Sequence, residues 1–225
     1  MDLGICVASH IGDVDYVVRA EELGYKCAWL ADSQMLWSDC YATLALAATR
    51  THKIHLGTGV AITGTRPAPV NAAGIATINA IAPGRTFFGV GAGNTAMRVM
   101  GLPPHRIKQF EQYLQTLVPL LKGEEGELHV GDKALPIKHI MPDNGFVNFK
   151  DPIPLYISGF GPKSLALAGK YGDGAVLGVN TPETVSGMWH LIQEGAKEIN
   201  RDLKPKENYY TTALTSMVVL EEGEA

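Results

Sequence analysis

The segment "PIPLYISGFGPKSLALAGKYGDGAVLG", residues 152–178, shows the unit from which the chain is built. An apolar run at 155–158 ends in a glycine-rich turn at 159–163. A stretch with helical period follows at 162–172, and a second apolar run begins at 174. A buried strand, a helix and a second buried strand are typical of a βαβ unit, whose two strands are parallel. The segment therefore predicts an α/β protein.

The same alternation runs along most of the chain. Strand-like runs are predicted at 3–9, 26–32, 53–62, 85–93, 153–158, 174–179 and 209–220, and helices at 13–24, 39–51, 67–84, 105–124, 162–172 and 182–200. Residues 125–150 lack helical period and carry turn signals, so they predict an excursion that could form a hairpin.

Six or seven consecutive units favour a (β/α)8 TIM-type barrel over a doubly wound sheet. A complete barrel takes about 250 residues, and the chain has 225. We therefore expect a single barrel domain, 1–225, that is short of its last strand and terminal helices. Either the barrel is incomplete or the sequence is a fragment.

Composition narrows the class of protein. Apolar residues make up 46% and charged residues 19%, as in a globular protein with a sizeable core. The net charge of −4 and the scattered basic residues argue against a nucleic-acid partner. No apolar run suggests a membrane span, and the N-terminus "MDLGICVASH" does not resemble a signal peptide. Three widely spaced cysteines, Cys6, Cys27 and Cys40, predict inert core thiols, no metal site and a cytoplasmic location.

In a parallel barrel the active site lies at the carboxyl ends of the strands. The residues there are glycines, small hydroxyls and amides, with neither a metal-ligand cluster nor paired carboxylates. Such a rim fits a large cofactor that brings its own chemistry. The candidates are Ser9-His10, Asp32-Ser33, Thr58-Gly59-Val60, Gly91-Ala92-Gly93-Asn94, Ser158-Gly159-Phe160-Gly161 and Gly178-Val179-Asn180.

Two of these positions have competing interpretations. The turn from Gly159 to Lys163 precedes a helix, where free N–H groups favour an anion. It could equally be a tight turn with a solvated lysine. Asp32 either faces the barrel mouth or caps the following loop.

Three segments together resemble the bacterial-luciferase-like superfamily, most closely the coenzyme F420-dependent methylenetetrahydromethanopterin reductases and their relatives. They are "YKCAWLADS" (25–33), "HLGTGVAITGTRPAPVNAAGIATINAIAPGRTFFGVGAGN" (55–94) and "PLYISGFGPKSLALAGKYGDGAVL" (154–177). The resemblance implies a TIM-like barrel that binds F420 or FMN. It also implies a homo-oligomer.

The resemblance assigns roles to the rim. The bulge Thr58-Gly59-Val60 would back the ring, with a non-prolyl cis peptide at Gly59–Val60. The loop Gly159-Phe160-Gly161-Pro162-Lys163 would hold the phosphate, so we expect Gly159→Val to abolish cofactor binding in a folded protein. Asp32 would lie near the ring edge, and we take Asp32 and Ser33 as catalytic candidates. Further cofactor-binding candidates are Gly93, Asn94, Ser158 and Gly178.

Some residues depart from the family pattern. Ser33 stands where the family often has histidine, and Cys6 and Asn94 stand where the methanopterin reductases carry acids. The loss of these acids weakens the case for a methanopterin substrate. It leaves the expectation of ring binding unchanged.

The first functional hypothesis is an oxidoreductase that transfers hydride between F420 and a small organic substrate. Arg66, Arg98, Arg106 and Lys163 could meet the acidic tail of F420. The alternative is a monooxygenase that uses reduced FMN, oxygen and a flavin reductase partner. A non-catalytic or truncated flavin-binding barrel is the alternative of a different class.

Overall fold

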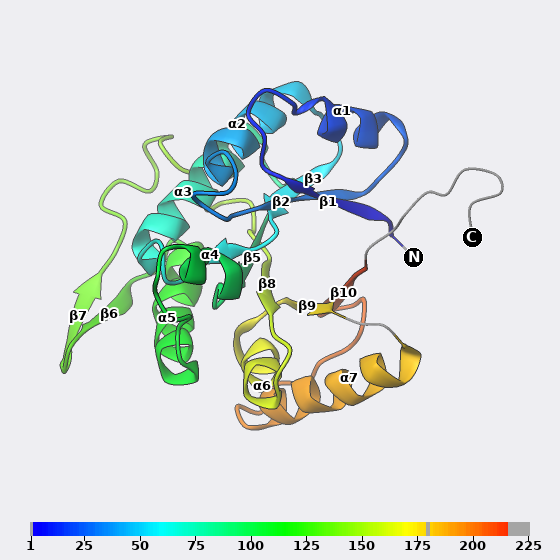
Figure 1. The fold of residues 1–225 in the computed structure, drawn as a ribbon. Helices are drawn as coiled ribbons and strands as arrows, with labels where there is room; N and C mark the ends of the chain where they lie inside the picture. Colours follow the sequence, from blue (N-terminus) through cyan, green and yellow to red (C-terminus); the bar gives the residue numbers. More distant parts are fainter. Residues whose placement is uncertain (1, 179–180, 216–225) are drawn as a thin grey trace.

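The computed structural model describes residues 2–178 and 181–215. Its main feature is a curled sheet with the strand order β1-β2-β3-β5-β8-β9-β10 (Figure 1). The short strand β4 follows β3 along the chain and also pairs with β5. The strands are β1 (Gly4–Ala8), β2 (Cys27–Ala31), β3 (His55–Thr58), β4 (Ala61–Ile62), β5 (Thr86–Gly91), β8 (Leu155–Ser158), β9 (Gly174–Gly178) and β10 (Tyr210–Leu214). All neighbours in this sheet are parallel, which confirms the predicted barrel wall.

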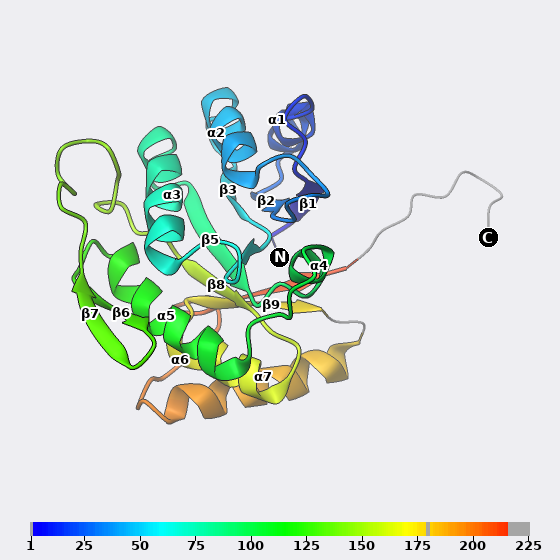
Figure 2. The same ribbon diagram turned by 60° about the vertical axis from the view of Figure 1, so that its left-hand side comes forward.

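Helices cover the outer face of this sheet (Figure 2). They are α1 (Asp15–Glu22), α2 (Cys40–Arg50), α3 (Ala68–Ile81), α5 (Ile107–Leu121), α6 (Pro162–Tyr171) and α7 (Pro182–Lys197). A short helix, α4 (Asn94–Val99), follows β5 and was not predicted.

The central strands β2, β5 and β9 are largely apolar and buried because both of their faces are covered. On β2, Ala28 and Leu30 belong to the large core against the helices. The alternate residue Trp29 points to the inside of the curl, where it packs against Phe87 with ring centroids 4.3 Å apart. Successive side chains of a strand point to opposite faces, so a strand enclosed on both sides has no polar alternation.

The predicted strand 53–62 is wrong in one respect, because it is two strands. β3 ends at Thr58 and β4 begins at Ala61, with a cis peptide bond between Gly59 and Val60. Residues 53–62 look like one apolar strand in the sequence. The interruption between β3 and β4 depends on contacts with the neighbouring strand. An added Cβ at Gly59 would lie 2.7 Å from the Cβ of Trp29 on β2.

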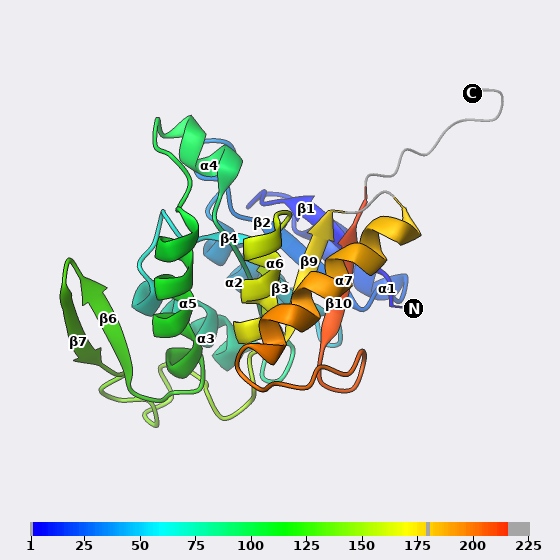
Figure 3. The ribbon, with the colours of Figure 1, turned by 90° about the horizontal axis from the view of Figure 1, so that it is seen from below.

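The excursion at 125–150 contains the hairpin that the turn signals allowed. β6 (Gly126–Val130) pairs antiparallel with β7 (Lys133–Ile137), and Gly131 supplies the positive φ of the turn. The hairpin projects beside α5, away from the barrel wall (Figure 3).

The sheet path ends at β1 on one side and β10 on the other, and these strands do not pair in the described part of the chain. A hydrogen bond from the Tyr210 hydroxyl to Asp2 Oδ2, 2.8 Å long, joins them near their amino ends. Cys6 lies on β1 and is exposed, so its prediction as a core thiol is wrong. The predicted last strand, 209–220, is observed to Leu214, and its part from 216 onward lies outside the described residues.

Two half-buried histidines predict a pH dependence of stability. Burial lowers the pKa of His105 and of His139 below the ordinary 6.5. Each also has one buried ring nitrogen without a hydrogen-bond partner. The unfolded chain therefore takes up protons at these sites before the folded chain does.

Their contribution to stability is present above pH 6.5 and is lost as the pH falls below it. We expect the melting temperature to drop between about pH 7.5 and about pH 5.5, where histidine titrates. Thermal unfolding of wild type and His105→Gln/His139→Gln across this range checks the prediction. An equally steep drop in the double variant would contradict it.

Candidate functional site

The predicted site residues lie at one end of the parallel sheet, because each is the last residue of a strand or comes soon after it. They come from β2 (Asp32, Ser33), β3 (Thr58, Gly59, Val60), β5 (Gly93, Asn94), β8 (Ser158 to Lys163) and β9 (Gly178). Val179 and Asn180 lie outside the described residues.

The bulge after β3 is held by its neighbours on both sides. The Gly59 N–H donates to the Leu30 carbonyl at 2.6 Å, and the Thr58 hydroxyl donates to the Gly89 carbonyl at 2.5 Å. Thr58 is fully buried, so its side chain supports the bulge from behind. Val60 is half-buried and packs with Trp29 inside the curl. The bulge therefore offers an apolar face to the barrel interior.

The loop after β8 forms the start of α6. Gly161 is the N-cap, and the Ser164 hydroxyl closes the turn by accepting the Gly161 N–H at 3.2 Å and donating to the Gly161 carbonyl at 2.9 Å. The Leu165 N–H makes the bond to Gly161 that starts the helix, at 3.0 Å. The N–H groups of Lys163 and Ser164 precede it and have no recorded partner among the described residues.

The charge at this loop is positive and unneutralised. The Lys163 side chain is exposed and takes part in none of the ion pairs found in 2–178 and 181–215. Pro162 occupies the first helical position, where a missing N–H costs nothing. Free N–H groups, the positive end of a helix and a lysine together suit a phosphate or carboxylate.

The two glycines of this loop differ in how closely they are packed. An added Cβ at Gly161 would meet nothing within 4 Å, whereas one at Gly159 would lie 2.7 Å from Ser164 Oγ and 3.0 Å from its carbonyl carbon. Gly159 is thus required for packing of the turn on α6. Gly159→Val would therefore force Ser164 or the turn to shift, so lost cofactor binding in this variant would not by itself report on the phosphate. Gly178 in turn lies against the ring of Phe160, which is 62% exposed.

Gly93 and Asn94 lie at the start of α4. Gly93 is the N-cap in the left-handed region, with φ of 80°, and α4 packs Met97 against Ile62. Glycine adopts this backbone conformation without strain. The chain after β5 therefore continues as a short helix, which the sequence did not predict.

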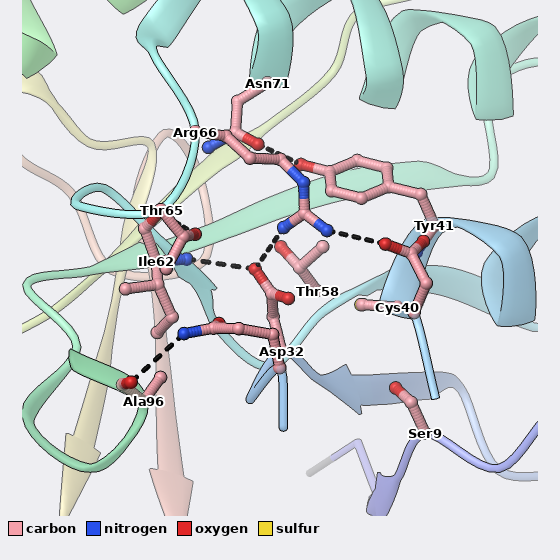
Figure 4. Close-up of polar contacts among 12 residues, drawn as sticks. Ser9, Asp32, Cys40, Tyr41, Thr58, Ile62, Thr65, Arg66, Asn71 and Ala96 are labelled. Atoms are coloured by element: carbon pink, nitrogen blue, oxygen red, sulfur yellow. Dashed lines mark hydrogen bonds and ion pairs between the residues drawn. The ribbon is translucent and has the colours of Figure 1, made fainter. Parts of the chain in front are cut away.

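Asp32 is buried and paired. It is 4% exposed, and its Oδ2 accepts the Ile62 N–H at 3.2 Å and Arg66 Nη1 at 2.8 Å (Figure 4). These bonds reach β4 and the loop before α3, so the interpretation of Asp32 as a cap of its own loop is wrong. Ser33 is half-buried, and its carbonyl accepts the Trp37 N–H in the next turn.

Arg66 was a candidate for the acidic tail of F420, but it is already paired with two carboxylates, those of Asp32 and Asp39. Its Nη2 donates to Asp39 Oδ2 at 2.7 Å, and its guanidinium lies 4.9 Å from the centroid of the Tyr41 ring. The Tyr41 hydroxyl donates to Asn71, and Asn71 donates to the Tyr113 hydroxyl. Burial raises the pKa of Tyr41 and of Tyr113, so both hydroxyls keep their protons.

The luciferase-like monooxygenase family model matches residues 12–225. The chain belongs to this family. It is 33% identical over 195 residues to a 5,10-methylenetetrahydromethanopterin reductase of Methanolobus tindarius, covering 85% of this chain and 57% of the reductase. It is 28% identical over 212 residues to an F420-dependent glucose-6-phosphate dehydrogenase of Beutenbergia cavernae, covering 84% of this chain and 59% of the dehydrogenase. The chain thus spans less than two thirds of the length of these relatives.

Solved structures show the same fold. An F420-dependent tetrahydromethanopterin reductase from Methanopyrus kandleri matches with a TM-score of 0.75 and 24% identity, covering 95% of this chain and 65% of that one. An F420-dependent secondary alcohol dehydrogenase matches with a TM-score of 0.77 and 22% identity, covering 94% and 68%. The fold prediction and the family resemblance are both confirmed.

For this luciferase-like protein, sequence reasoning missed the Arg66 contacts with Asp39 and Tyr41. One signal was visible, because an aspartate directly before a helical run is a common N-cap. Asp39 caps α2 by accepting the N–H groups of Tyr41 and Ala42. The pairing of Arg66 with Asp32 had no local signal, since 34 positions separate them.

Two further findings concern the described residues. They contain no group of three or more His, Cys, Asp or Glu side chains placed to hold a metal ion. Within the same residues, every helix is too short or too polar to cross a bilayer.

Proposed function

We propose that this chain is the cofactor-binding barrel of an oxidoreductase that transfers hydride between coenzyme F420 and a small organic substrate. The observation that carries the proposal is the loop of Gly161 and Lys163, open and positively charged, at the same sheet end as the Gly59–Val60 bulge. Relatives at 28–33% identity that are named for the methanopterin reductase and for F420-dependent dehydrogenation support this choice of cofactor.

Each part of the rim has a role in the proposal. Lys163 and the first N–H groups of α6 would bind the cofactor phosphate, and the bulge at Val60 would back one face of the ring. Bound F420 supplies the hydride chemistry at its ring carbon C5. The apolar packing of Trp29 and Val60 keeps water from the covered ring face. Asp32 would accept a hydrogen bond from the ring edge.

The substrate is proposed only as a small organic molecule. The family resemblance implies acids in the methanopterin reductases at the positions of Cys6 and Asn94, so a methanopterin is not the substrate that we propose. The FMN-dependent alternative has weaker support, because a neighbour solved with FMN shares 16% identity with this chain. A flavin reductase partner belongs to that alternative, while a homo-oligomer and a cytoplasmic location stay predictions.

The test is a parallel titration of the purified protein with F420 and with FMN, followed by equilibrium dialysis. Preference for F420 supports the hydride-transfer proposal. Preference for FMN would replace it with oxygen chemistry. Binding of neither by a folded sample would favour the non-catalytic or truncated barrel.

A further inference from the structure

The carboxylate of Asp32 is buried so deeply that its charge needs a paired cation. Its side chain is 3% exposed and follows the last residue of β2. A buried charge is costly unless it is paired and hydrogen-bonded. In this site the pairing comes from Arg66, whose side chain is 21% exposed.

Arg66 is itself fixed from a second direction. Nη1 binds Asp32 and Nη2 binds Asp39, so one planar guanidinium bridges two carboxylates (Figure 4). Asp39 uses its other oxygen, Oδ1, to cap α2. The ring of Tyr41, also on α2, lies beside the guanidinium. The position of Arg66, and through it that of Asp32, is therefore tied to the start of α2.

The two oxygens of Asp32 are used unequally. Both recorded bonds, from Ile62 and from Arg66, go to Oδ2, and Oδ1 has no partner among the residues that the structure describes. An ionised carboxylate can accept several hydrogen bonds on each oxygen. One oxygen is thus anchored and the other remains available at the carboxyl end of β2.

We propose that Arg66, anchored by Asp39, is a positioning residue that holds Asp32 so that its free oxygen can accept a hydrogen bond from the cofactor ring. The proposal rests on the proposed function, because Asp32 needs a ring beside it. It assigns Arg66 to the orientation of an acid, in place of the contact with the cofactor tail that the sequence suggested.

The experiment measures the dissociation constant of F420 and the melting temperature for wild type, Asp32→Asn, Arg66→Gln, Arg66→Lys and the double variant Asp32→Asn/Arg66→Gln. A hydrogen bond to a charged group is worth about tenfold or more in affinity. We expect each single Asn or Gln change to weaken binding by about tenfold. The double variant should bind no more weakly than the single ones, since Arg66 acts through Asp32. Arg66→Lys should lose less affinity than Arg66→Gln, because lysine keeps the positive charge.

Arg85→Gln is the matched control. Arg85 is also half-buried, but it donates to backbone carbonyls of Thr51 and Ile54 at the opposite end of the sheet. It should lower the melting temperature and leave F420 affinity unchanged.

Three outcomes overturn the inference in distinguishable ways. If Arg66→Gln lowers only the melting temperature, as Arg85→Gln does, Arg66 is structural. If the losses in the double variant add, Arg66 does not act through Asp32. If wild type binds neither F420 nor FMN, the proposed function fails and the inference fails with it. The titration is repeated with FMN. If wild type prefers FMN, the same variants are compared by their dissociation constants for FMN.

Discussion

Gly161→Asp is expected to weaken F420 binding by at least about 100-fold, which corresponds to about 2.7 kcal/mol. Gly161 has φ of −98° and ψ of 160°, a conformation that any residue adopts, and its Cβ would enter open space. Aspartate is also a preferred N-cap, whose carboxylate accepts the N–H groups of the first helical turn. These are the N–H groups of Lys163 and Ser164 that we assign to the phosphate.

The aspartate would therefore compete with the phosphate for donors and repel its charge. Two unit charges 4 Å apart interact by about 4 kcal/mol at a partly exposed site. Folding should respond in the opposite direction, because the new cap favours α6. We expect an unchanged or slightly higher melting temperature together with lost binding, which a general destabilisation cannot produce.

The measurement is a fluorescence or dialysis titration with F420, paired with thermal unfolding. Gly187→Asp is the control, since Gly187 is exposed in the middle of α7 and has nothing within 4 Å of its added Cβ. It makes the same change in net charge outside the Gly159–Lys163 loop and should bind F420 normally. Normal F420 binding by Gly161→Asp would show that the cofactor phosphate does not bind at this loop.

The sequence was most informative where structure depends on near neighbours. The period of the apolar residues located the parallel strands and their helices to within a few positions, and it placed the rim at the right end of the sheet. Turn signals at Gly131-Asp132 predicted the hairpin because a tight turn is set by its own residues. These features need only local propensity and the alternation of strand and helix.

It was least informative where distant segments decide. Cys6 reads as a core residue, yet it is exposed on an edge strand of the described sheet. Arg66 reads as a free cation, yet two carboxylates hold it, one of them from a strand end 34 positions earlier. Gly159 and Gly161 look equivalent in sequence, and only the packing of Ser164 separates them. In each case the deciding partner is absent from the local pattern.

Gly169→Val should be the most destabilising single change considered, at about 3 kcal/mol or more. Helices α6 and α7 pack against each other (Figures 1 and 3). Gly169 is buried on α6 at this contact. An added Cβ there would overlap the carbonyl oxygen of Ile192 and lie 2.9 Å from the Ala196 nitrogen. The obstacle is backbone, which cannot rotate away as a side chain can.

Relief would require α7 to move off α6, and such a shift uncovers residues that are now fully buried. Ile192 is 0% and Ala196 is 1% exposed. The approach is mutual, since an added Cβ at Gly195 of α7 would lie 2.5 Å from Ala166 Cα. A loss of 3 kcal/mol is a large share of the roughly 5–15 kcal/mol that holds a domain folded.

Helix propensity alone predicts the opposite sign, because replacing a helical glycine gains up to about 1 kcal/mol. Gly187→Ala, on the open face of α7, isolates that gain and should stabilise the protein. Urea unfolding of the two variants beside wild type decides between packing and propensity. If Gly169→Val unfolds at the wild-type urea concentration or above it, the close contact between α6 and α7 does not exist in solution.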